Sequence, residues 1–341
     1  MVASIEDVAK RAGVSIATVS RALRGLPDVA PATRDRVLAA ATELDYVASP
    51  FAARLASGRT TTVGLVVPWV NRWFFAEVID TVEQALRLAG FDLLLYNLGD
   101  KAGRTRFFEV MPMRKRVDGV LIVSLVLEDA EFSALTDLDL PVGLLGLERD
   151  GFLSVSIDDV GSARTAVDHL VELGHRRIAL IGGDTDDPMA FTPPMHRRDG
   201  YRDALRAVGV ESDPELEVLG YFTVDGGRAA MRHLLALPDR PSAVFAESDE
   251  MAYGALREIH RHGLRVPEDV AVVGFDDQPL SDLLGLTTVR QPVADEALDI
   301  TNRLLALIAD DAENIEHLPR DPAVVLPTEL VVRGSTVAGG A

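Results

Sequence analysis

Residues 5–25 read IEDVAKRAGVSIATVSRALRG, two short helical patterns separated by a single glycine. Ser4 and Asp7 match a weak form of the capping box, and Gly13 supplies a turn after the first helix. Ser15 is placed to cap the second helix. The inner face of the first helix is predicted from the apolar spacing i, i+3, i+4 and i+7, which selects Ile5, Val8, Ala9 and Ala12.

Two further helical faces follow. The second helix should turn Val19 and Leu23 inward, and a third helix is expected over residues 34–44, with Pro31 in its first turn. Its inner face consists of Val37, Ala41 and Leu44. Three short helices with a glycine turn between the first two are typical of a helix-turn-helix module, whose second helix enters the DNA major groove. A small helical bundle with an incidental glycine turn is the alternative.

The charge of the chain is unevenly distributed. Its 341 residues have a net charge of −19, which argues against a nucleic-acid partner, because such proteins usually have a basic surface. Up to residue 60, however, eight basic residues stand against six acidic ones, so this segment is +2 and the remainder is −21. DNA phosphates would be repelled everywhere except at the N-terminal segment.

Composition excludes several classes of protein. The chain has no cysteine, which excludes a disulfide scaffold, thiolate metal sites and cysteine nucleophiles, and fits a reducing cytoplasm. The first ten residues, MVASIEDVAK, do not form a signal peptide, and no apolar run reaches the length of a membrane span. We therefore expect a cytoplasmic protein with no membrane partner.

From residue 62 the pattern changes from helical to strand-like. Continuously apolar runs alternate with amphipathic helices such as residues 76–88, which is typical of parallel sheets covered on both faces. About 275 residues of this pattern are too many for one sheet, so we predict an α/β body of two doubly wound layers. The strand-like runs are VGLVV, FDLLLYN, GVLIVS, PVGLLG, RIALIGG, AVFAES and VAVVGFDD.

No catalytic, cofactor or metal motif is found. The turn after the first strand, GLVVPWVNRW, lacks the GxGxxG of a dinucleotide site, and no GxSxG, Walker or HExxH motif occurs. His260 and His262 are two apart on a predicted helix and cannot chelate one ion, and the adjacent Asp276 and Asp277 are a poor acid/base pair. His175 is interpreted as a structural residue between a helix and a strand. We predict no enzyme activity and no cofactor.

Several segments resemble one known family. Residues 5–25, together with ATRDRVLAAATELDY at 32–46, resemble the N-terminal headpiece of the lactose-repressor and purine-repressor (LacI/GalR) family of bacterial transcription regulators. The resemblance continues through GHRRIALIGG, DGYRDAL, VPEDVAVVGFDD and LTTVRQP, so it covers nearly the whole chain. It implies a helix-turn-helix headpiece and a two-lobed core like that of periplasmic sugar-binding proteins, with a ligand cleft between the lobes.

The resemblance also implies domain bounds. The headpiece is expected at 1–47, a hinge helix and linker at 48–60, and the effector-binding and dimerisation core at 61–335. Within the core, the first lobe is expected to comprise 61–158 and 288–321, and the second lobe 159–287 and 322–335.

DNA contacts are expected from the headpiece and the hinge. Arg21 is predicted to hydrogen-bond a base edge, with Ile16 and Ala17 reading thymine methyl groups or shape. In the family the hinge helix inserts a leucine into the minor groove, a position that Leu55 occupies here, although the hinge segment would also serve as a plain flexible linker. Six further residues are expected to bind phosphates or to cap helices, and so to position the headpiece: Ser4, Ser15, Thr18, Ser20, Thr33 and Arg34. The remaining predicted DNA contacts are Arg24, Ala52 and Arg54.

Effector contacts are expected at the carboxyl ends of the strands, where such clefts bind ligands. In the family an arginine, matched by Arg197, offers a fork of donors to ligand hydroxyls or to a carboxylate. An aspartate, matched by Asp276, accepts from ligand hydroxyls, and Phe222 matches an aromatic residue that closes the cleft. Phe75 is interpreted as core, and Asp249 as the cap of a helix that begins at Glu250. The other predicted effector contacts are Trp69, Asn71, Trp73, Phe74, Ser124 and Ser248.

The chain departs from the family at three cleft positions. Arg72 and Trp73 replace a common Asn-Pro, Ser248 with Asp249 replaces an Asn-Asp pair, and Gly146 stands where an aspartate is common. Neither a sugar-contacting nor a purine-contacting set of residues therefore transfers intact. The expected effector is a sugar, with a nucleobase or another metabolite as the alternative.

The sequence as a whole predicts a DNA-binding regulator, expected to be a repressor. Its partners are a palindromic operator, a small polar effector and a second copy of the chain, because a two-fold dimer matches an inverted repeat. The end STVAGGA contains no leucine heptad, so a dimer is expected rather than a tetramer. A solute-binding transport protein and a sugar-acting enzyme are the alternatives from other classes.

Overall fold

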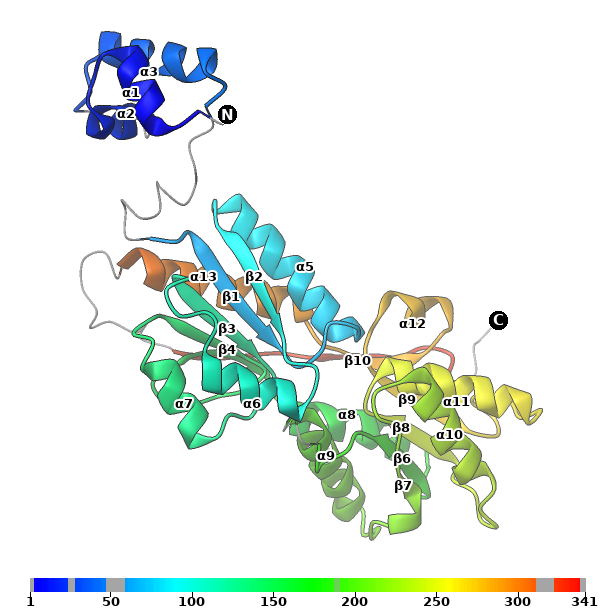
Figure 1. Ribbon diagram of the computed structural model, residues 1–341. Coiled ribbons are helices and arrows are strands. Elements are labelled where there is room, and N and C mark those ends of the chain that lie inside the picture. The colour runs from blue at the N-terminus through cyan, green and yellow to red at the C-terminus, as the bar shows by residue number, and fades with distance from the viewer. Residues whose placement is uncertain are drawn as a thin grey trace. The chain divides into compact units, whose positions relative to one another are not determined.

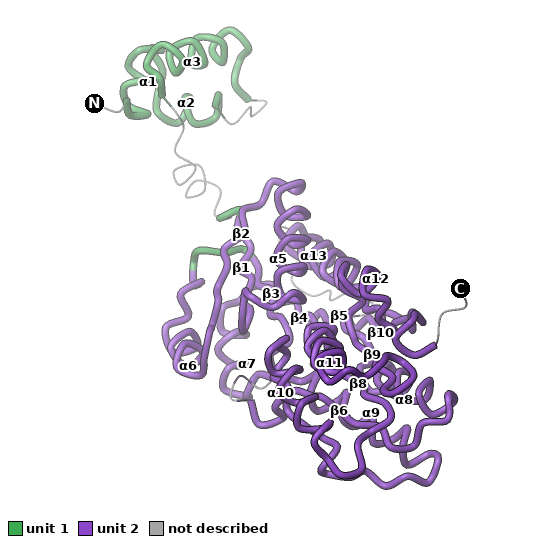
Figure 2. Tube along the Cα trace, turned by 90° about the vertical axis from the view of Figure 1, so that its right-hand side faces the viewer, with its two compact units in different colours: residues 1–61, 115–118 green, residues 62–114, 119–341 purple. Residues whose placement is uncertain are grey.

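The computed structural model describes residues 3–23, 28–46, 59–187, 189, 191–310 and 322–337. The chain divides into two compact units, one formed by residues 1–61 with 115–118 and the other by 62–114 with 119–341 (Figure 2). Val8, Val19 and Val37 form the centre of a hydrophobic core within the first unit, and separate hydrophobic clusters lie within the second.

The described part of the first unit contains the helices α1 (Ile5–Ala12), α2 (Ile16–Leu23) and α3 (Pro31–Glu43). The capping box is confirmed, because Asp7 N–H donates to Ser4 Oγ at 3.2 Å and Ser4 N–H donates to Asp7 Oδ2 at 2.9 Å. Gly13 ends α1 in the left-handed conformation, with φ of 66°. The third helix begins at Pro31 rather than at residue 34, since a proline at the first helical position loses no helical hydrogen bond.

The first sheet of the second unit is entirely parallel, in the order β11-β5-β4-β3-β1-β2. Helices α5 (Trp73–Leu88) and α13 (Val293–Asp310) cover one face, and α6 (Lys101–Val110) and α7 (Asp129–Thr136) cover the other (Figure 1). We call this sheet with its helices the first lobe. Its strands are β1 (Thr62–Val67), β2 (Asp92–Asn97), β3 (Gly119–Val123), β4 (Val142–Leu145), β5 (Leu153–Ile157) and β11 (Ala323–Leu326).

The second sheet has the order β12-β10-β9-β8-β6-β7, parallel except for β12. We call it, with its helices, the second lobe. Its strands are β6 (Ile178–Gly182), β7 (Glu217–Leu219), β8 (Ala243–Ala246), β9 (Ala271–Asp276), β10 (Thr287–Arg290) and β12 (Glu329–Val331). Its helices are α8 (Asp159–Glu172), α9 (Pro193–Ala207), η1 (Pro214–Leu216), α10 (Val224–Leu235), α11 (Asp249–Arg261) and α12 (Pro279–Leu283).

The expected lobe bounds need two corrections. The sequence placed residues 288–321 in the first lobe, but β10 pairs with β9 and belongs to the second sheet. It placed 322–335 in the second lobe, but β11 pairs with β5 and belongs to the first sheet. The chain therefore crosses between lobes after β5, after β10 and after β11. Short strands near a crossing do not differ in apolar pattern, so the sequence could not assign them.

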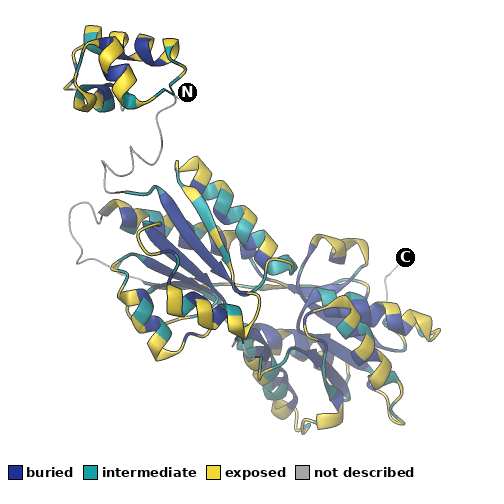
Figure 3. Cartoon of the chain, viewed as in Figure 1, coloured by how far each residue is buried: buried dark blue, intermediate teal, exposed yellow. Residues whose placement is uncertain are grey.

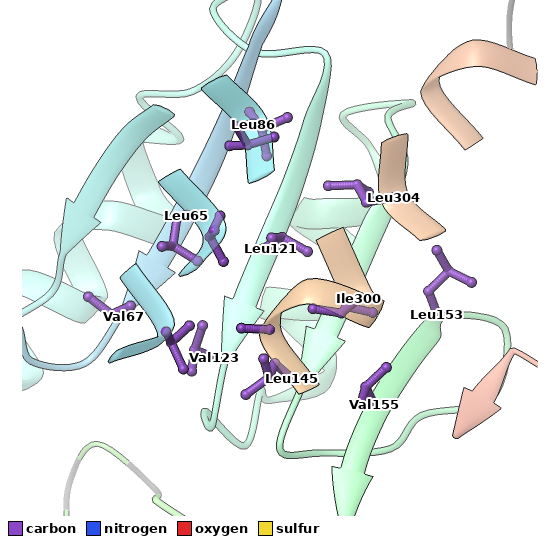
Figure 4. Packing of buried hydrophobic residues seen from close by; sticks show 14 of the residues in the cluster. Leu65, Val67, Leu86, Leu121, Val123, Leu145, Leu153, Val155, Ile300 and Leu304 are labelled. Carbon is purple, nitrogen blue, oxygen red and sulfur yellow. The ribbon is translucent and has the colours of Figure 1, made fainter. Parts of the chain in front are cut away.

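Burial follows the layered architecture. The central strands are buried along their whole length, whereas the helices expose their outer faces (Figure 3). In the first lobe, Leu65 of β1, Leu121 of β3, and Ile300 and Leu304 of α13 form one continuous cluster (Figure 4). Strand β2 lies at the sheet edge and is partly exposed, although its sequence is as apolar as that of a central strand. All seven predicted strands are present.

Candidate functional site

A cavity lies between the two lobes, with residues of both lobes in its lining. Both sheets direct the carboxyl ends of their strands toward it: Ser124 follows β3, Gly146 follows β4 and Ser248 follows β8, while Asp276 ends β9. This is where open α/β sheets bind ligands. Six of the nine predicted effector residues line the cavity, namely Phe74, Ser124, Arg197, Phe222, Ser248 and Asp276.

Aromatic rings form the apolar wall of the cavity. The Phe74 and Phe75 rings meet edge to face, with centroids 5.2 Å apart, and the Phe191 and Phe222 rings do the same at 5.3 Å. Phe75 is both core, as predicted, and part of the lining. Phe191, which was not predicted, lies just before α9, and no sequence pattern around it indicates that it lines the cavity. This wall suits the apolar face of a sugar ring or a base.

Arg197 on α9 is buried among fixed partners. Its Nε donates to Asp159 Oδ1 at 2.7 Å, its Nη1 donates to the Glu247 carbonyl oxygen at 2.6 Å, and its guanidinium lies 3.6 Å from the centroid of the Phe275 ring. Within the protein, Nε and Nη1 of Arg197 are therefore already engaged, and the contact of Arg197 with a ligand stays a prediction. No bond of Nη2 is found among the described residues.

Asp276 is held by two amide side chains. Gln291 Nε2 donates to its Oδ1 at 2.5 Å, and Gln278 Nε2 donates to its Oδ2 at 3.3 Å. Burial raises the pKa of Asp276 well above its usual range, despite the opposing effect of Arg197. Asp276, Ser124 and Phe222 all have positive φ values, of 125°, 48° and 54°. Backbone strain of this kind is concentrated at binding sites, where it fixes side-chain direction.

Three predicted effector residues lie outside this cavity. Trp69 and Asn71 line an adjoining outer pocket, which shares Arg72, Phe222 and Glu250 with the cavity. The Arg72 guanidinium lies 3.7 Å from the Trp69 ring centroid, so Trp69 contacts a protein cation. Trp73 packs on the hydrophobic cluster of the first lobe, and its backbone N–H donates to Glu250 Oε1 at 3.4 Å.

The cap of α11 also differs from expectation. The helix begins at Asp249, and Ser248 caps it by accepting from Met251 N–H. Asp249 is fully buried and instead accepts from Gln278 N–H, Ser281 Oγ and Thr288 Oγ1. Asp249 therefore links α11 to the start of α12 and to β10.

Three acidic side chains of the cavity other than Asp276 were not predicted. Asp159, Glu250 and Glu296 line it, and the fully buried Glu247 lies behind Arg197 and accepts from Gly183 N–H at 2.7 Å. Burial raises the pKa of both Glu247 and Glu296 to about 8. A signal for Glu296 existed, because it falls on the apolar stripe of α13 formed by Val293, Ala297 and Ile300.

His175 lies between a helix and a strand as predicted, whereas His262 is the C-cap of α11 rather than a residue within that helix. His175, between α8 and β6, shares a hydrogen bond of 2.9 Å with Ser242, and His262 contacts the Glu258 carbonyl oxygen. No group of three or more possible ligands that could hold a metal ion occurs within the described residues.

The second helix of the headpiece presents an exposed face that contains both apolar and charged residues. Ile16, Ala17 and Arg21 are exposed, and Arg21 Nε lies 3.7 Å from Asp28 Oδ2. Thr18 N–H donates to Ser15 Oγ, so Ser15 caps α2, as predicted. Ser20, Thr33 and Arg34 are half-buried. The other predicted DNA contacts, Arg24, Ala52, Arg54 and Leu55, lie outside the described residues.

A helix-turn-helix unit joined to a two-lobed binding core defines a ligand-responsive, DNA-binding regulator. The model of bacterial regulatory proteins of the lacI family matches residues 4–49, and that of the periplasmic binding protein-like domain matches 167–336. No helix within the described ranges is long and apolar enough to cross a membrane.

Relatives along the whole chain agree with these matches. The chain is 38% identical to the transcriptional regulator CelR of Thermobifida fusca, covering 97% of this chain and 98% of CelR. It is 35% identical to the transcriptional repressor CytR of Escherichia coli strain K12, covering 98% and 97%. The chain therefore belongs to the lacI family of bacterial helix-turn-helix transcriptional regulators, and these relatives are regulators rather than enzymes.

Solved structures support the same assignment. The complex of the regulator CelR with cellobiose has a TM-score of 0.69 at 38% identity and covers 98% of this chain and 99% of that one. The lac repressor dimer bound to operator and the anti-inducer ONPF has a TM-score of 0.84 at 26% identity, covering 99% and 100%.

Proposed function

We propose that this protein is a repressor that binds a palindromic operator as a homodimer and whose operator affinity is controlled by a sugar bound between the lobes. The main support is the cavity itself. It combines aromatic faces at Phe74, Phe191 and Phe222 with the hydrogen-bonding side chains of Asp276 and Gln291. A sugar has this pattern of apolar ring face and surrounding hydroxyl groups.

The proposed division of labour follows the predicted domain bounds. Arg21, Ile16 and Ala17 of the exposed face of α2 read base edges, while Ser4, Ser15, Thr18, Ser20, Thr33 and Arg34 position the headpiece on phosphates. Ala52, Arg54 and Leu55, with Arg24, complete the DNA contacts. The core at 61–335 binds the sugar and dimerises. The protein works in the cytoplasm, where its DNA is, and binds its effector without turning it over.

The effector must act by binding two states of the core with different affinity. The test is to select bound sites from random duplexes with the full chain, and then to measure operator affinity by fluorescence anisotropy while adding sugars, nucleosides and nucleobases. The proposal predicts that sugars change operator affinity, by about 1–3 kcal/mol of coupling. A response to nucleobases alone would show that the effector is a nucleobase rather than a sugar. Selection of no DNA sequence would refute operator binding.

A further inference from the structure

Glu296 is a buried acid aimed into the cavity with one oxygen unpaired. It lies in the first turn of α13, is 2% exposed, and lines the cavity. Its Oε1 is buried and has no hydrogen-bond partner among the described residues. A buried polar atom without a partner is costly, and a charged one more so. Burial, with Asp159 nearby, accordingly raises the pKa of Glu296 to about 8.

The other charged groups of the cavity already have partners. Arg197 is bonded to Asp159, and Arg72 stacks on Trp69 with Glu250 nearby. Asp276 is bonded to Gln291 and Gln278, and Glu250 accepts from the Trp73 N–H. Within the part of the cavity that the structure describes, Glu296 is the acid left for a ligand to satisfy.

The charge of the lining indicates what kind of donor Glu296 would bind. Four carboxyl groups, Asp159, Glu250, Asp276 and Glu296, surround the cavity with only two guanidinium groups, Arg72 and Arg197. A ligand hydroxyl supplies one hydrogen bond and no charge. An ammonium group supplies three donors together with the opposite charge, and charge-assisted hydrogen bonds are about twice as strong as neutral ones.

We propose, on the basis of the sugar-binding function proposed above, that the effector is an amino sugar whose protonated amino group donates to Glu296. Glu296 then selects between ligands that have the same skeleton but differ in one amino or hydroxyl group. The first turn of α13 favours this contact, because the positive end of a helix stabilises the carboxylate that the ammonium needs as its partner.

Calorimetry on the full chain with matched pairs of ligands tests the proposal. The pairs are glucosamine and glucose, galactosamine and galactose, and the β-1,4-linked glucosamine dimer and cellobiose, measured at about pH 7, where most of the amino groups are protonated. Because the pKa of Glu296 is raised in the free protein, Glu296 must release its proton to pair with the ammonium group, so the preference for the amine should be smaller at about pH 6. We expect the amine of at least one pair to bind roughly tenfold more tightly than its hydroxyl counterpart. Glu296→Gln should abolish this preference, so that the amine and the hydroxyl sugar of each pair bind with affinities within about twofold of each other.

Asp295→Asn is the matched control. It removes the same charge from the adjacent residue of the same turn, but Asp295 is exposed and does not line the cavity. The preference should survive in this variant. The proposal is overturned if hydroxyl sugars bind as tightly as amines in every pair, if Glu296→Gln keeps the preference, or if Asp295→Asn also loses it. Binding of hydroxyl sugars alone leaves the proposed function intact, whereas binding of no sugar of either kind overturns its sugar part as well.

Discussion

Arg104 of the first lobe donates a hydrogen bond from Nη1 to the Met189 carbonyl oxygen of the second lobe, 2.6 Å away. The guanidinium is buried and also bonds to both carboxylate oxygens of Glu131 and to the Val126 carbonyl oxygen. Met189 belongs to the connection that leads to Phe191 in the cavity wall. One arginine of the first lobe therefore holds a cavity-lining segment of the second.

Arg104→Ala should lower the free energy of unfolding by about 3 kcal/mol, because it leaves the Glu131 carboxylate, whose side chain is only 14% exposed, without its cation. Thermal and urea unfolding of the full chain measure this loss. Arg149→Ala is the control, since Arg149 pairs with Asp129 on the surface, where such pairs contribute about 0–1 kcal/mol. Similar losses in both variants would contradict a special role for Arg104.

Arg21→Ala should weaken binding to the selected operator by about 1–3 kcal/mol and weaken binding to random DNA much less, because a bidentate base contact is specific to sequence. Anisotropy with both duplexes at one salt concentration measures the two losses. Arg11→Ala, which removes another exposed headpiece arginine paired with Glu43, should not change the ratio of the two affinities. If Arg21→Ala weakens binding to both duplexes equally, Arg21 contacts only phosphate.

Asp276→Asn should weaken binding of an identified sugar by about 1–3 kcal/mol, because it places an amide donor against the donors of Gln291 and Gln278. Operator binding without sugar should stay within about twofold, since the headpiece is unaltered. Calorimetry and anisotropy measure the two effects. Asp282→Asn, which changes an exposed aspartate, should affect neither. Unchanged sugar affinity in Asp276→Asn would show that the sugar binds elsewhere.

The raised pKa of Glu247 predicts that the free energy of unfolding falls as pH rises. Its pKa is raised from 4.5 to about 8 by burial, so between these values the unfolded chain loses a proton that the folded chain keeps. The contribution of Glu247 is fully present below about pH 4.5 and is lost progressively up to about pH 8. Glu296 acts in the same direction, so the comparison must be made between variants.

Glu247→Gln should therefore gain stability over wild type as pH increases from 5 to 8, because an amide does not ionise, while its oxygen can still accept from Gly183 N–H. Urea unfolding at several pH values measures the gain. A difference between the two proteins that does not change with pH would contradict the raised pKa.

The sequence alone was enough for the features that depend on neighbouring residues. The capping box of Ser4 and Asp7 and the left-handed turn at Gly13 are contacts within a few residues, so the residue types define them. The buried strands could be predicted because a parallel strand that is covered on both faces must be apolar throughout. Arg197, Phe222 and Asp276 were placed in the cleft by resemblance to the family, and the structure brings them together.

Tertiary structure decided what lies opposite each of those residues. The cavity joins residues as distant along the chain as Phe74 and Glu296, and their proximity depends on which sheet each strand enters. The donors of Arg197 are occupied by Asp159 and Glu247, Trp69 stacks on Arg72, and Phe191 enters the wall from a segment without periodicity. Local propensity acts over a few residues, whereas the pairing of a buried charge or ring is determined by the packing of elements far apart in the chain.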